Sequence, residues 1–542
     1  MFQTIFNLIV ALFLFSLLSF STSASELTTE QKLSDFEQLV SSMKSGYGPL
    51  KYKEESRGIS IDVLAKSYSE KIRETKSNGA FYYLIVKFVA EFKDSHFSAS
   101  LPTSHRANLG FICDMVEGKI LIADINRDRL PEEKFPFKRG DEIISMNGQP
   151  IDSALEALMP YISSGNLLTQ KKMATFFLTS RQGSTLPVPT EKTAKFTISS
   201  NGNMVETEVE WILKGQYFDE YIAPKTDKSG HLRNSTAMDF GLVSVKDIWN
   251  SFRDESIEAD YLCSGTTRIA IPENSTIIMK EPFVAYYHPT EKGNIGYLRI
   301  PDYMPVNPST GDTEFDLRLA QYEYAVSILE KNTTGLIIDQ DHNCGGSVSY
   351  LEAIVSLFMP TSFAPMQFQL LASKASYLTF LTWLNNSDQY TMEYGELQSV
   401  AEVVKRNWLD GNFLTFEKIA LSGQLSIAPN NIRYTHPIVM LIDEHSGSGG
   451  DAFPSMLQGY GRAKLFGTRT MGAGGHVSSA PSLNFSGIRV MMTKSLFFRP
   501  DGVPVENNGA VPDYHYTITR NDFLNEYREY QKSYLQALFD LL

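Results

Sequence analysis

The spacing of apolar residues changes twice along this chain of 542 residues. Between residues 26 and 95, apolar side chains such as Phe36 and Leu39 recur at helical spacing. From Asn108 onwards, short apolar runs separated by turn residues predict β-strands. From about Phe283, predicted strands alternate with helical stretches, which is typical of an α/β domain. The pattern therefore predicts a helical region, a β-rich region and an α/β region, in that order.

The β-rich region contains a Gly-Asp turn at Gly140-Asp141, an apolar strand after it, and an Asn-Gly turn at Asn147-Gly148. The other predicted elements are strands at 109–112 and 119–123, a helix at 153–162 and a closing strand at 205–211. This order resembles the PDZ domain, in which Gly110-Phe111 would form the loop that binds a peptide carboxylate. A small β-barrel without a ligand is the alternative.

The α/β region contains predicted strands at 296–300, 335–339 and 437–442. Residues 388–424 read as a mostly helical insertion between the second and third of these strands. The polar stretch before the region, residues 214–282, has few clean periodicities and is interpreted as a linker or an insertion.

The strand at 437–442 leads into the small-residue turn Ser446-Gly447-Ser448-Gly449-Gly450, and a helix is predicted from Ala452. A serine at such a junction holds its hydroxyl at the edge of the sheet, and a following glycine lets substrate approach the backbone. The Gly449 N–H near a helix N-terminus favours developing negative charge. The segment therefore suits a nucleophilic serine with half of an oxyanion hole, although most such turns in α/β proteins hold no nucleophile.

Composition narrows the class of protein. Hydrophobic residues make up 42% of the chain, enough for a sizeable core, and the length predicts three or four domains. The formal net charge is −13 and there is no basic run, which argues against nucleic acid as a partner.

The first residues read as a targeting segment. Ile5 to Phe20 is almost continuously apolar, and Thr22-Ser23-Ala24 offers small residues for cleavage. We expect a signal peptide over residues 1–24 and export to the periplasm or the medium, although the usual Lys or Arg before the apolar run is missing. An uncleaved anchor is the alternative, but the run is short for a membrane span. We therefore expect no stable membrane insertion after cleavage.

The three cysteines, Cys113, Cys263 and Cys344, allow at most one disulfide and leave one free thiol. Their spacing fits no zinc site. The sequence implies neither a metal nor an organic cofactor.

Three stretches of the α/β region occur in an order that is informative as a set. They are the strand Gly293–Ile300, the loop Asn343-Cys344-Gly345-Gly346, and the Ser448 turn with the Gly461-Arg462-Ala463 segment after its helix. Together with the PDZ-like stretch, this order resembles the tail-specific, or C-terminal processing, serine peptidases. The resemblance implies that the Gly449 N–H and an N–H of Gly345 or Gly346 form the oxyanion hole.

The chain departs from the common form of that family at the catalytic base. Most members place a lysine 25 residues after the serine in a Gly-Lys-Gly turn, but here the turn reads Gly472-Ala473-Gly474. Alanine cannot take a proton, so a nucleophilic Ser448 needs another base.

The branch of the chlamydial protease-like activity factor uses a serine–histidine–glutamate triad instead. Its histidine lies in a segment similar to Lys93-Asp94-Ser95-His96, and its glutamate in a stretch similar to Asp501-Gly502-Val503-Pro504-Val505-Glu506. The resemblance implies that Ser448 attacks, that His96 is the general base and that Glu506 orients His96. It also implies control of activity by internal cleavage or by formation of a homodimer.

Competing residues remain at this stage. Ser446 is the second choice for the nucleophile because a Ser-x-Ser register can slip by two. His342 and His445 are the local rivals of His96, although His445 is close in sequence to Ser448 for folding back onto it.

The sequence thus predicts a multidomain α/β protein with a core of the ClpP/crotonase type. The predicted parts are a signal peptide (1–24), a helical N-terminal region (25–106), a PDZ-like domain (107–213), a linker or insertion (214–282) and a peptidase core (283–542). We expect an exported serine endopeptidase that acts on polypeptides through an acyl-enzyme. The alternatives are an inactive ligand- or peptide-binding protein on the same scaffold, and a hydrolase of non-peptide esters or amides.

Overall fold

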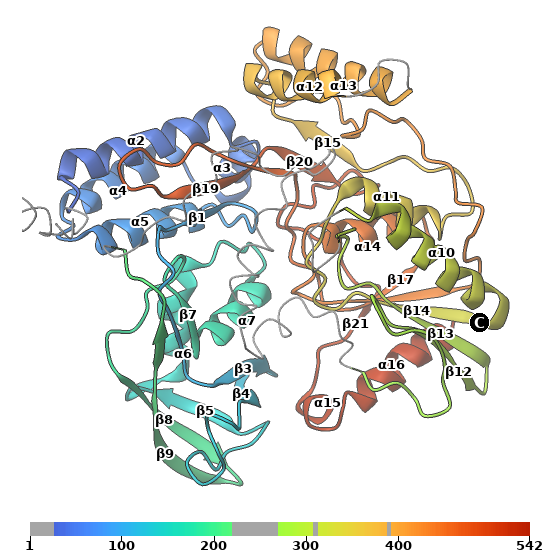
Figure 1. Ribbon diagram of the computed structural model, residues 1–542, viewed down its shortest axis with the longest axis horizontal. Helices are drawn as coiled ribbons and strands as arrows, with labels where there is room; N and C mark the ends of the chain where they lie inside the picture. Colours follow the sequence, from blue (N-terminus) through green and yellow to red (C-terminus); the bar gives the residue numbers. More distant parts are fainter. Residues whose placement is uncertain (1–25, 219–268, 307–312, 387–391) are drawn as a thin grey trace, which may run out of the picture.

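The computed structural model describes residues 26–218, 269–306, 313–386 and 392–542 (Figure 1). The predicted signal peptide, Cys263 and most of the predicted linker lie outside these residues. None of the helices in the described ranges combines the length and the apolarity that a membrane crossing requires.

The described N-terminal residues form a helical layer, as the apolar spacing predicts. Phe36 and Leu39 are fully buried in its core. The first helix begins at a capping box, in which the Thr28 hydroxyl accepts the Gln31 N–H and the Gln31 side chain accepts the Thr28 N–H. The helices of this layer are α2 (Thr29–Gly46), α3 (Leu50–Arg57), α4 (Ile61–Arg73) and α5 (Asn78–Ala90).

A segment from the C-terminal half of the chain completes this helical layer. Strand β1 (Ser98–Ser100) pairs with β19 (Arg489–Thr493), which also pairs with β18 (Val477–Ser479). Ile488, Val490 and Met492 are buried in the same hydrophobic cluster as the helices. Figure 1 shows this red ribbon lying among the blue helices. The two ends of the chain therefore share one core.

The β-rich region packs below the helical layer in Figure 1. Its main sheet has the order β3-β4-β5-β8-β9, and β6 pairs with β5. The predicted strand at 109–112 begins only at Phe111, because Gly110 adopts a φ of +86° that ends extended pairing before it. The elements are β3 (Phe111–Val116), β4 (Lys119–Ile125), β5 (Glu142–Met146), β6 (Gln149–Pro150), α6 (Ile151–Leu158), α7 (Leu167–Phe177), β8 (Thr193–Ser200) and β9 (Asn203–Glu210). A smaller sheet beside it joins β10 (Ile212–Lys214), β2 (Arg106–Asn108) and β7 (Ser180–Gln182).

Within the described residues, the core is built on a seven-stranded sheet of order β11-β12-β13-β14-β16-β17-β21. The pairing is parallel from β13 to β21, as alternating strands and helices predict. The predicted strand at 335–339 is found at those residues, and its side chains are buried on both faces. The strands are β11 (Thr276–Met279), β12 (Ala285–Thr290), β13 (Gly293–Arg299), β14 (Gly335–Asp339), β16 (Ile438–Ile442), β17 (Lys464–Gly467) and β21 (Tyr514–His515).

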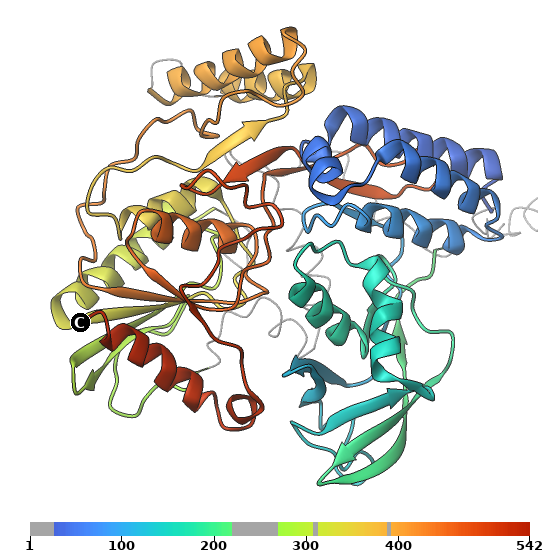
Figure 2. The same cartoon turned by 180° about the vertical axis from the view of Figure 1, so that it is seen from behind.

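Helices cover both faces of this sheet. Leu336 and Ile338 share a cluster with α10 (Phe315–Asn332), α11 (Val348–Ser356) and α14 (Gly449–Gly459). Ile337 points to the other face, in the cluster that contains α16 (Arg528–Phe539). Seen from behind, α16 lies across the sheet on the side away from α14 (Figure 2). The short α15 (Arg520–Leu524) precedes α16.

The helical insertion begins earlier in the chain than the predicted 388–424, which contains only its second helix. It consists of α12 (Lys374–Asn386) and α13 (Met392–Leu409), which project at the top of Figure 1. The helix ends soon after Leu409 because Gly411 has a φ of +80°, and the described residues 412–424 form no helix. The insertion is joined to the core by the pairing of β15 (Gln367–Leu370) with β20 (Ser495–Phe498).

Candidate active site

The turn after β16 holds Ser448 in an unusual backbone conformation. Ser448 has φ 58° and ψ −112°, and α14 begins at the next residue, Gly449. A non-glycine residue with positive φ is strained and persists only where its surroundings fix it. The helix starts three residues earlier than predicted, so the Gly449 N–H lies in its first turn.

Asp451 fixes this turn from inside. Its Oδ2 accepts the Ser448 N–H at 2.9 Å and the Ala473 N–H at 2.8 Å. Its Oδ1 accepts the Gly472 N–H at 2.7 Å and the Thr470 hydroxyl. Burial raises the pKa of Asp451 to about 6, although these hydrogen bonds lower it. One carboxylate thus joins the Ser448 turn to the Gly472–Gly474 turn.

The glycines of the predicted oxyanion loop pack directly against the Ser448 turn. A Cβ on Gly345 would lie 2.6 Å from Ser448 Cβ, and a Cβ on Gly449 would lie 3.0 Å from Gly345 Cα. The Gly345 N–H donates to Asn343 Oδ1 at 2.8 Å. Gly346 lines the cleft beside Ser448, whereas a Cβ there would lie 2.1 Å from the Tyr303 carbonyl oxygen. Only glycines therefore allow the two loops to approach this closely.

Ser448 and His96 line one cleft, together with Gly346, Gly449 and Ala473. The cleft encloses about 540 Å³ of space, part of which is open solvent. The remaining lining residues are mostly apolar, and they are Val348, Leu351, Met366, Phe368, Gly475, His476, Val477 and Phe497.

His96 reaches the cleft from the loop that follows α5. Asp94 holds this loop, because its Oδ1 accepts the His96 N–H at 2.8 Å. Its Oδ2 accepts the Tyr47 hydroxyl at 2.9 Å and the Thr493 hydroxyl at 2.7 Å. Helix α2, the His96 loop and strand β19 therefore meet at Asp94.

The turn Gly472-Ala473-Gly474 stands where the common form of the resembled family has its lysine. Here this turn and the next residue contact Glu506 and His96. The Gly474 N–H donates to Glu506 Oε2 at 3.0 Å, and the backbone of Gly475 hydrogen-bonds the His96 ring. A Cβ on Gly474 would lie 2.5 Å from the Glu506 backbone nitrogen. The Glu506 carboxylate and the His96 ring thus bind the backbone of two consecutive residues, Gly474 and Gly475. His96 Nδ1 is buried and has no hydrogen-bond partner among the described residues.

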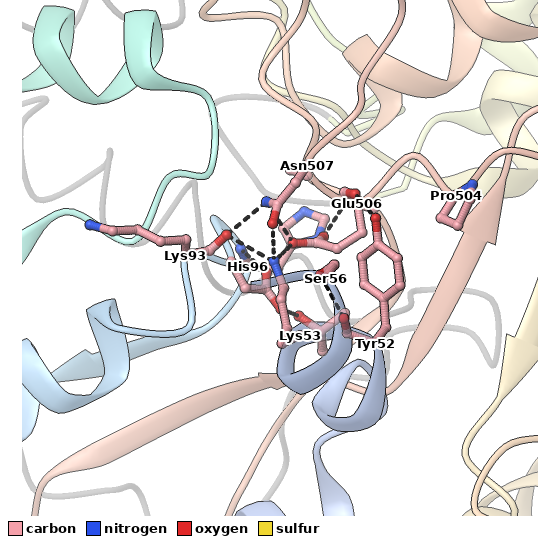
Figure 3. Close-up of polar contacts among 12 residues, drawn as sticks. Tyr52, Lys53, Ser56, Lys93, His96, Pro504, Glu506 and Asn507 are labelled. Carbon is pink, nitrogen blue, oxygen red and sulfur yellow. Dashed lines mark hydrogen bonds and ion pairs between the residues drawn. The ribbon is translucent and has the colours of Figure 1, made fainter. Parts of the chain in front are cut away.

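Glu506 is fully buried and forms an ion pair with Lys53 of α3. Asn507 Nδ2 donates to the same Glu506 oxygen, Oε1, at 3.1 Å. Figure 3 shows the side chains of Lys53, His96, Glu506 and Asn507 close together, with the backbone of Lys93 beside them and its side chain pointing away. The predicted serine, histidine and glutamate therefore lie in one region of the molecule, with Lys53 beside them.

Burial sets the protonation of these groups. Burial lowers the pKa of His96, against the opposing effects of Asp94 and the Gly475 hydrogen bond, so the imidazole is neutral at neutral pH. Burial and the Asp94 charge raise the pKa of Glu506 to about 8, and the Lys53 ammonium opposes them. A neutral imidazole is the form that can accept a proton from a serine.

The rival residues have structural partners. Ser446 is fully buried, and its hydroxyl donates to the Gln340 carbonyl and to Asp443 Oδ1, each at 2.9 Å. His342 Nδ1 contacts Asp443 Oδ2. The rings of His342 and His445 pack with their centroids 4.5 Å apart. None of these three side chains lines the Ser448 cleft.

Two residues of the site were not anticipated from the sequence. His476 lines the cleft, and its Nδ1 lies 2.7 Å from Ser495 Oγ. Burial and the nearby Lys494 and His96 lower the pKa of His476 to about 3. The only signal for His476 was its position three residues after Ala473. Lys53 had no local signal, because its contacts depend on tertiary packing.

The described cysteines, Cys113 and Cys344, agree with the prediction of at most one disulfide and one free thiol. Cys113 is a buried free thiol, and burial raises its pKa well above the usual range. Cys344 is disulfide-bonded.

Comparison with known proteins agrees with this geometry. Residues 294–516 match peptidase family S41, and residues 105–223 match the PDZ domain. The protein is a serine peptidase, with one region that matches peptidase family S41, one that matches the PDZ domain, and the fold of mature CPAF.

Its similarity to chlamydial proteins extends over almost the whole chain. It is 26% identical to an uncharacterised protein of Chlamydia muridarum (strain MoPn / Nigg) over 576 residues, covering 95% of this chain and 93% of the relative. It is 25% identical to a protein of Chlamydia trachomatis serovar D, covering 93% of this chain and 92% of that relative. The crystal structure of mature CPAF superposes with a TM-score of 0.76 at 25% identity, covering 95% of this chain and 98% of the other. The predicted family and fold class are confirmed.

Proposed function

We propose that this protein is an exported endopeptidase that cuts polypeptides through Ser448, His96 and Glu506. The observation that carries the proposal is the shared cleft, which Ser448 and His96 line together with the glycines of two loops. These residues come from segments far apart in the sequence, so their convergence is not a product of local chain geometry.

In the proposed reaction Ser448 Oγ attacks the peptide carbonyl carbon while His96 takes the hydroxyl proton. His96 then gives this proton to the leaving amine, and water releases the acyl group in a second, similar step. The N–H groups of Gly449 and Gly346 hold the oxyanion. Gly346 is preferred to Gly345, whose N–H already donates to Asn343. One such donor contributes about 10²-fold or more to the rate.

Glu506 completes the proposed triad by accepting from His96 Nδ1 and stabilising the imidazolium. Two facts support this role: Gly474 and Gly475 bring the two side chains to adjacent backbone positions, and His96 Nδ1 has no other partner among the described residues. Because His96 Nδ1 has no partner among the described residues, this role requires the His96 ring and the Glu506 carboxylate to move until they meet.

The chemistry of the cleft suggests the preferred substrate. Apolar side chains, among them Leu351, Met366, Phe368 and Phe497, line the space beside Ser448. Burial of an apolar substrate side chain there would stabilise the complex by about 25 cal/mol per Å² of apolar area removed from water. We propose that the enzyme cuts next to apolar residues of unfolded or extended polypeptides.

The predicted division of labour among the parts of the chain belongs to this proposal. The helical region (25–106) supplies His96, the core (283–542) supplies Ser448 and Glu506, and the PDZ-like domain (107–213) would bind peptide ends. Export is supported by the apolar run Ile5–Phe20 alone.

The test compares two serines of the same turn. Ser448→Ala should reduce cleavage of labelled casein by the purified mature chain to background and abolish labelling by a fluorophosphonate probe. Ser446→Ala removes a buried hydroxyl that lies outside the cleft, so it should keep most activity and lose about 1 kcal/mol of stability. Labelling without peptide cleavage would indicate a hydrolase of other esters or amides, and absence of both would indicate a binding protein.

A further inference from the structure

Helix α3 is described in full, and Lys53 is its one charged residue with a fully buried side chain. Its ammonium group donates to Asn507 Oδ1 at 2.7 Å and to the Lys93 carbonyl oxygen at 2.8 Å, and it pairs with Glu506 Oε1. Three acceptors therefore use the three N–H donors of the ammonium group.

The position of this lysine is unusual for a structural residue. A lysine is almost never fully buried unless its charge is matched, because desolvation of an ammonium ion costs several kcal/mol. An apolar side chain could fill the same space in α3 without that cost. The buried charge therefore indicates a role beyond packing, and the group that it pairs with is Glu506, the carboxylate assigned to the triad.

We propose that Lys53 is a positioning residue of the active site, which stabilises the ionised form of Glu506 behind His96. This inference rests on the proposed function, because it assumes that Glu506 acts through His96. Lys53 touches neither the substrate cleft nor Ser448.

The charges around Glu506 explain why a cation is needed. Asp94 lies close enough to destabilise a second anion, and it raises the pKa of Glu506 together with burial. Lys53 acts in the opposite direction on the same pKa. Without it, the pKa of Glu506 would rise further, so the anion that stabilises the His96 imidazolium would form only at higher pH.

The remaining groups that face Glu506 cannot supply this charge. Tyr52 of α3 donates its hydroxyl to the Glu506 carbonyl oxygen at 3.1 Å, not to the carboxylate. The Tyr47 hydroxyl donates to Asp94 rather than to Glu506, and burial raises the pKa of Tyr47. Asn507 and the Gly474 N–H donate to the carboxylate but are neutral. Lys93 contributes its carbonyl oxygen to Lys53, while its own ammonium group donates to the Ile162 carbonyl oxygen.

The decisive measurement is the pH dependence of kcat/KM for casein-derived fluorogenic peptides with Lys53→Met. We expect kcat/KM at pH 7 to fall about 10-fold or more and its acid limb to move to higher pH, with KM little changed. Lys53→Arg keeps the cation and should restore part of the activity. Lys32→Met is the matched control, since Lys32 is also buried in the helical layer but, among the described residues, its ammonium group donates to the Ser77 carbonyl oxygen at 3.4 Å and to no carboxylate.

A second variant keeps the inference testable if Lys53→Met does not fold. Lys53→Met/Glu506→Gln removes both buried charges, and it should match Glu506→Gln alone in kcat, because Lys53 acts through Glu506. An unchanged pH profile in Lys53→Met, a rise in its activity, or a further large loss in the double variant would overturn the inference. A wild-type chain that cuts no peptide would instead refute the proposed function, so the two failures are distinguishable.

Discussion

The carboxylate of Asp451 accepts the backbone N–H of Ser448 at 2.9 Å, so the residue three positions into helix α14 fixes the residue that precedes the helix. This bond holds Ser448 at a φ of 58°. The same carboxylate oxygen accepts the Ala473 N–H, which ties the nucleophile turn to the backbone segment that contacts Glu506 and His96.

We therefore expect Asp451→Asn to impair catalysis without removing any group that touches substrate. An amide nitrogen would face backbone N–H donors, leaving buried groups unpaired at a cost of about 1–3 kcal/mol each. The displaced serine should lower kcat at least about tenfold. Steady-state kinetics and thermal unfolding check this result. Asp62→Asn, at an exposed ion pair, is the control, and equal behaviour of both variants would contradict the role of Asp451.

The pH dependence of wild-type activity should report Glu506. The pKa of Glu506 is raised to about 8 and the active form is ionised, so kcat/KM should increase as pH rises through that value. Burial lowers the pKa of His96, which is already neutral in this range. Glu506→Gln should reduce turnover by orders of magnitude and remove the limb. A limb in the ordinary imidazole range that survives in Glu506→Gln would assign it to His96.

A lysine at the position used by most relatives should not act as a base here. In a His96→Ala background, which should be nearly as inactive as Ser448→Ala, Ala473→Lys should restore no measurable turnover. Asp451 and Glu506 bind the backbone of Ala473 and Gly474, and such carboxylates would keep the new ammonium group charged. Ala473→Met in the same background controls for side-chain size. Recovery of activity with lysine but not methionine would show that the lysine mechanism remains accessible.

Lys172 of α7 links the PDZ domain to the nucleophile turn. Its ammonium group lies 3.1 Å from Asp114 of β3 and 3.1 Å from Glu444, which follows β16. Lys172→Met should lower the free energy of unfolding by about 3 kcal/mol, because two buried carboxylates lose this cation. Urea denaturation measures the loss. Lys119→Met removes an exposed pair with Glu142 in the same domain and should cost less than about 1 kcal/mol. Similar losses of unfolding free energy in both variants would show that the buried contacts of Lys172 stabilise the protein no more than the exposed pair of Lys119 with Glu142.

The parts of the fold that the sequence predicts well are those governed by local pattern. Strand β14 is found at the predicted residues because Leu336, Ile337 and Ile338 form an apolar run that must be buried on both sheet faces. The predicted insertion (388–424) contains α13 but omits α12, since helical spacing in 374–386 is hard to distinguish from that of a core helix.

The site shows the same division. Ser448 and the glycine loops are recognisable because strand-to-helix turns have a local chemical signature. Lys53 is not, because a lysine in an amphipathic helix such as α3 is usually exposed, and its burial is explained by its tertiary contacts with Glu506, Asn507 and the Lys93 carbonyl oxygen. The pairing of β1 with β19 likewise joins segments that share no pattern in the sequence.

This pairing also determines when during synthesis the helical layer can become stable. Helices α2 to α5 leave the ribosome long before Ile488, Val490 and Met492, which complete their core. The bond between Thr493 and Asp94 spans 399 residues, and such long-range contacts form slowly. The loop that carries His96 therefore gains this tertiary contact only after residue 493 has been synthesised.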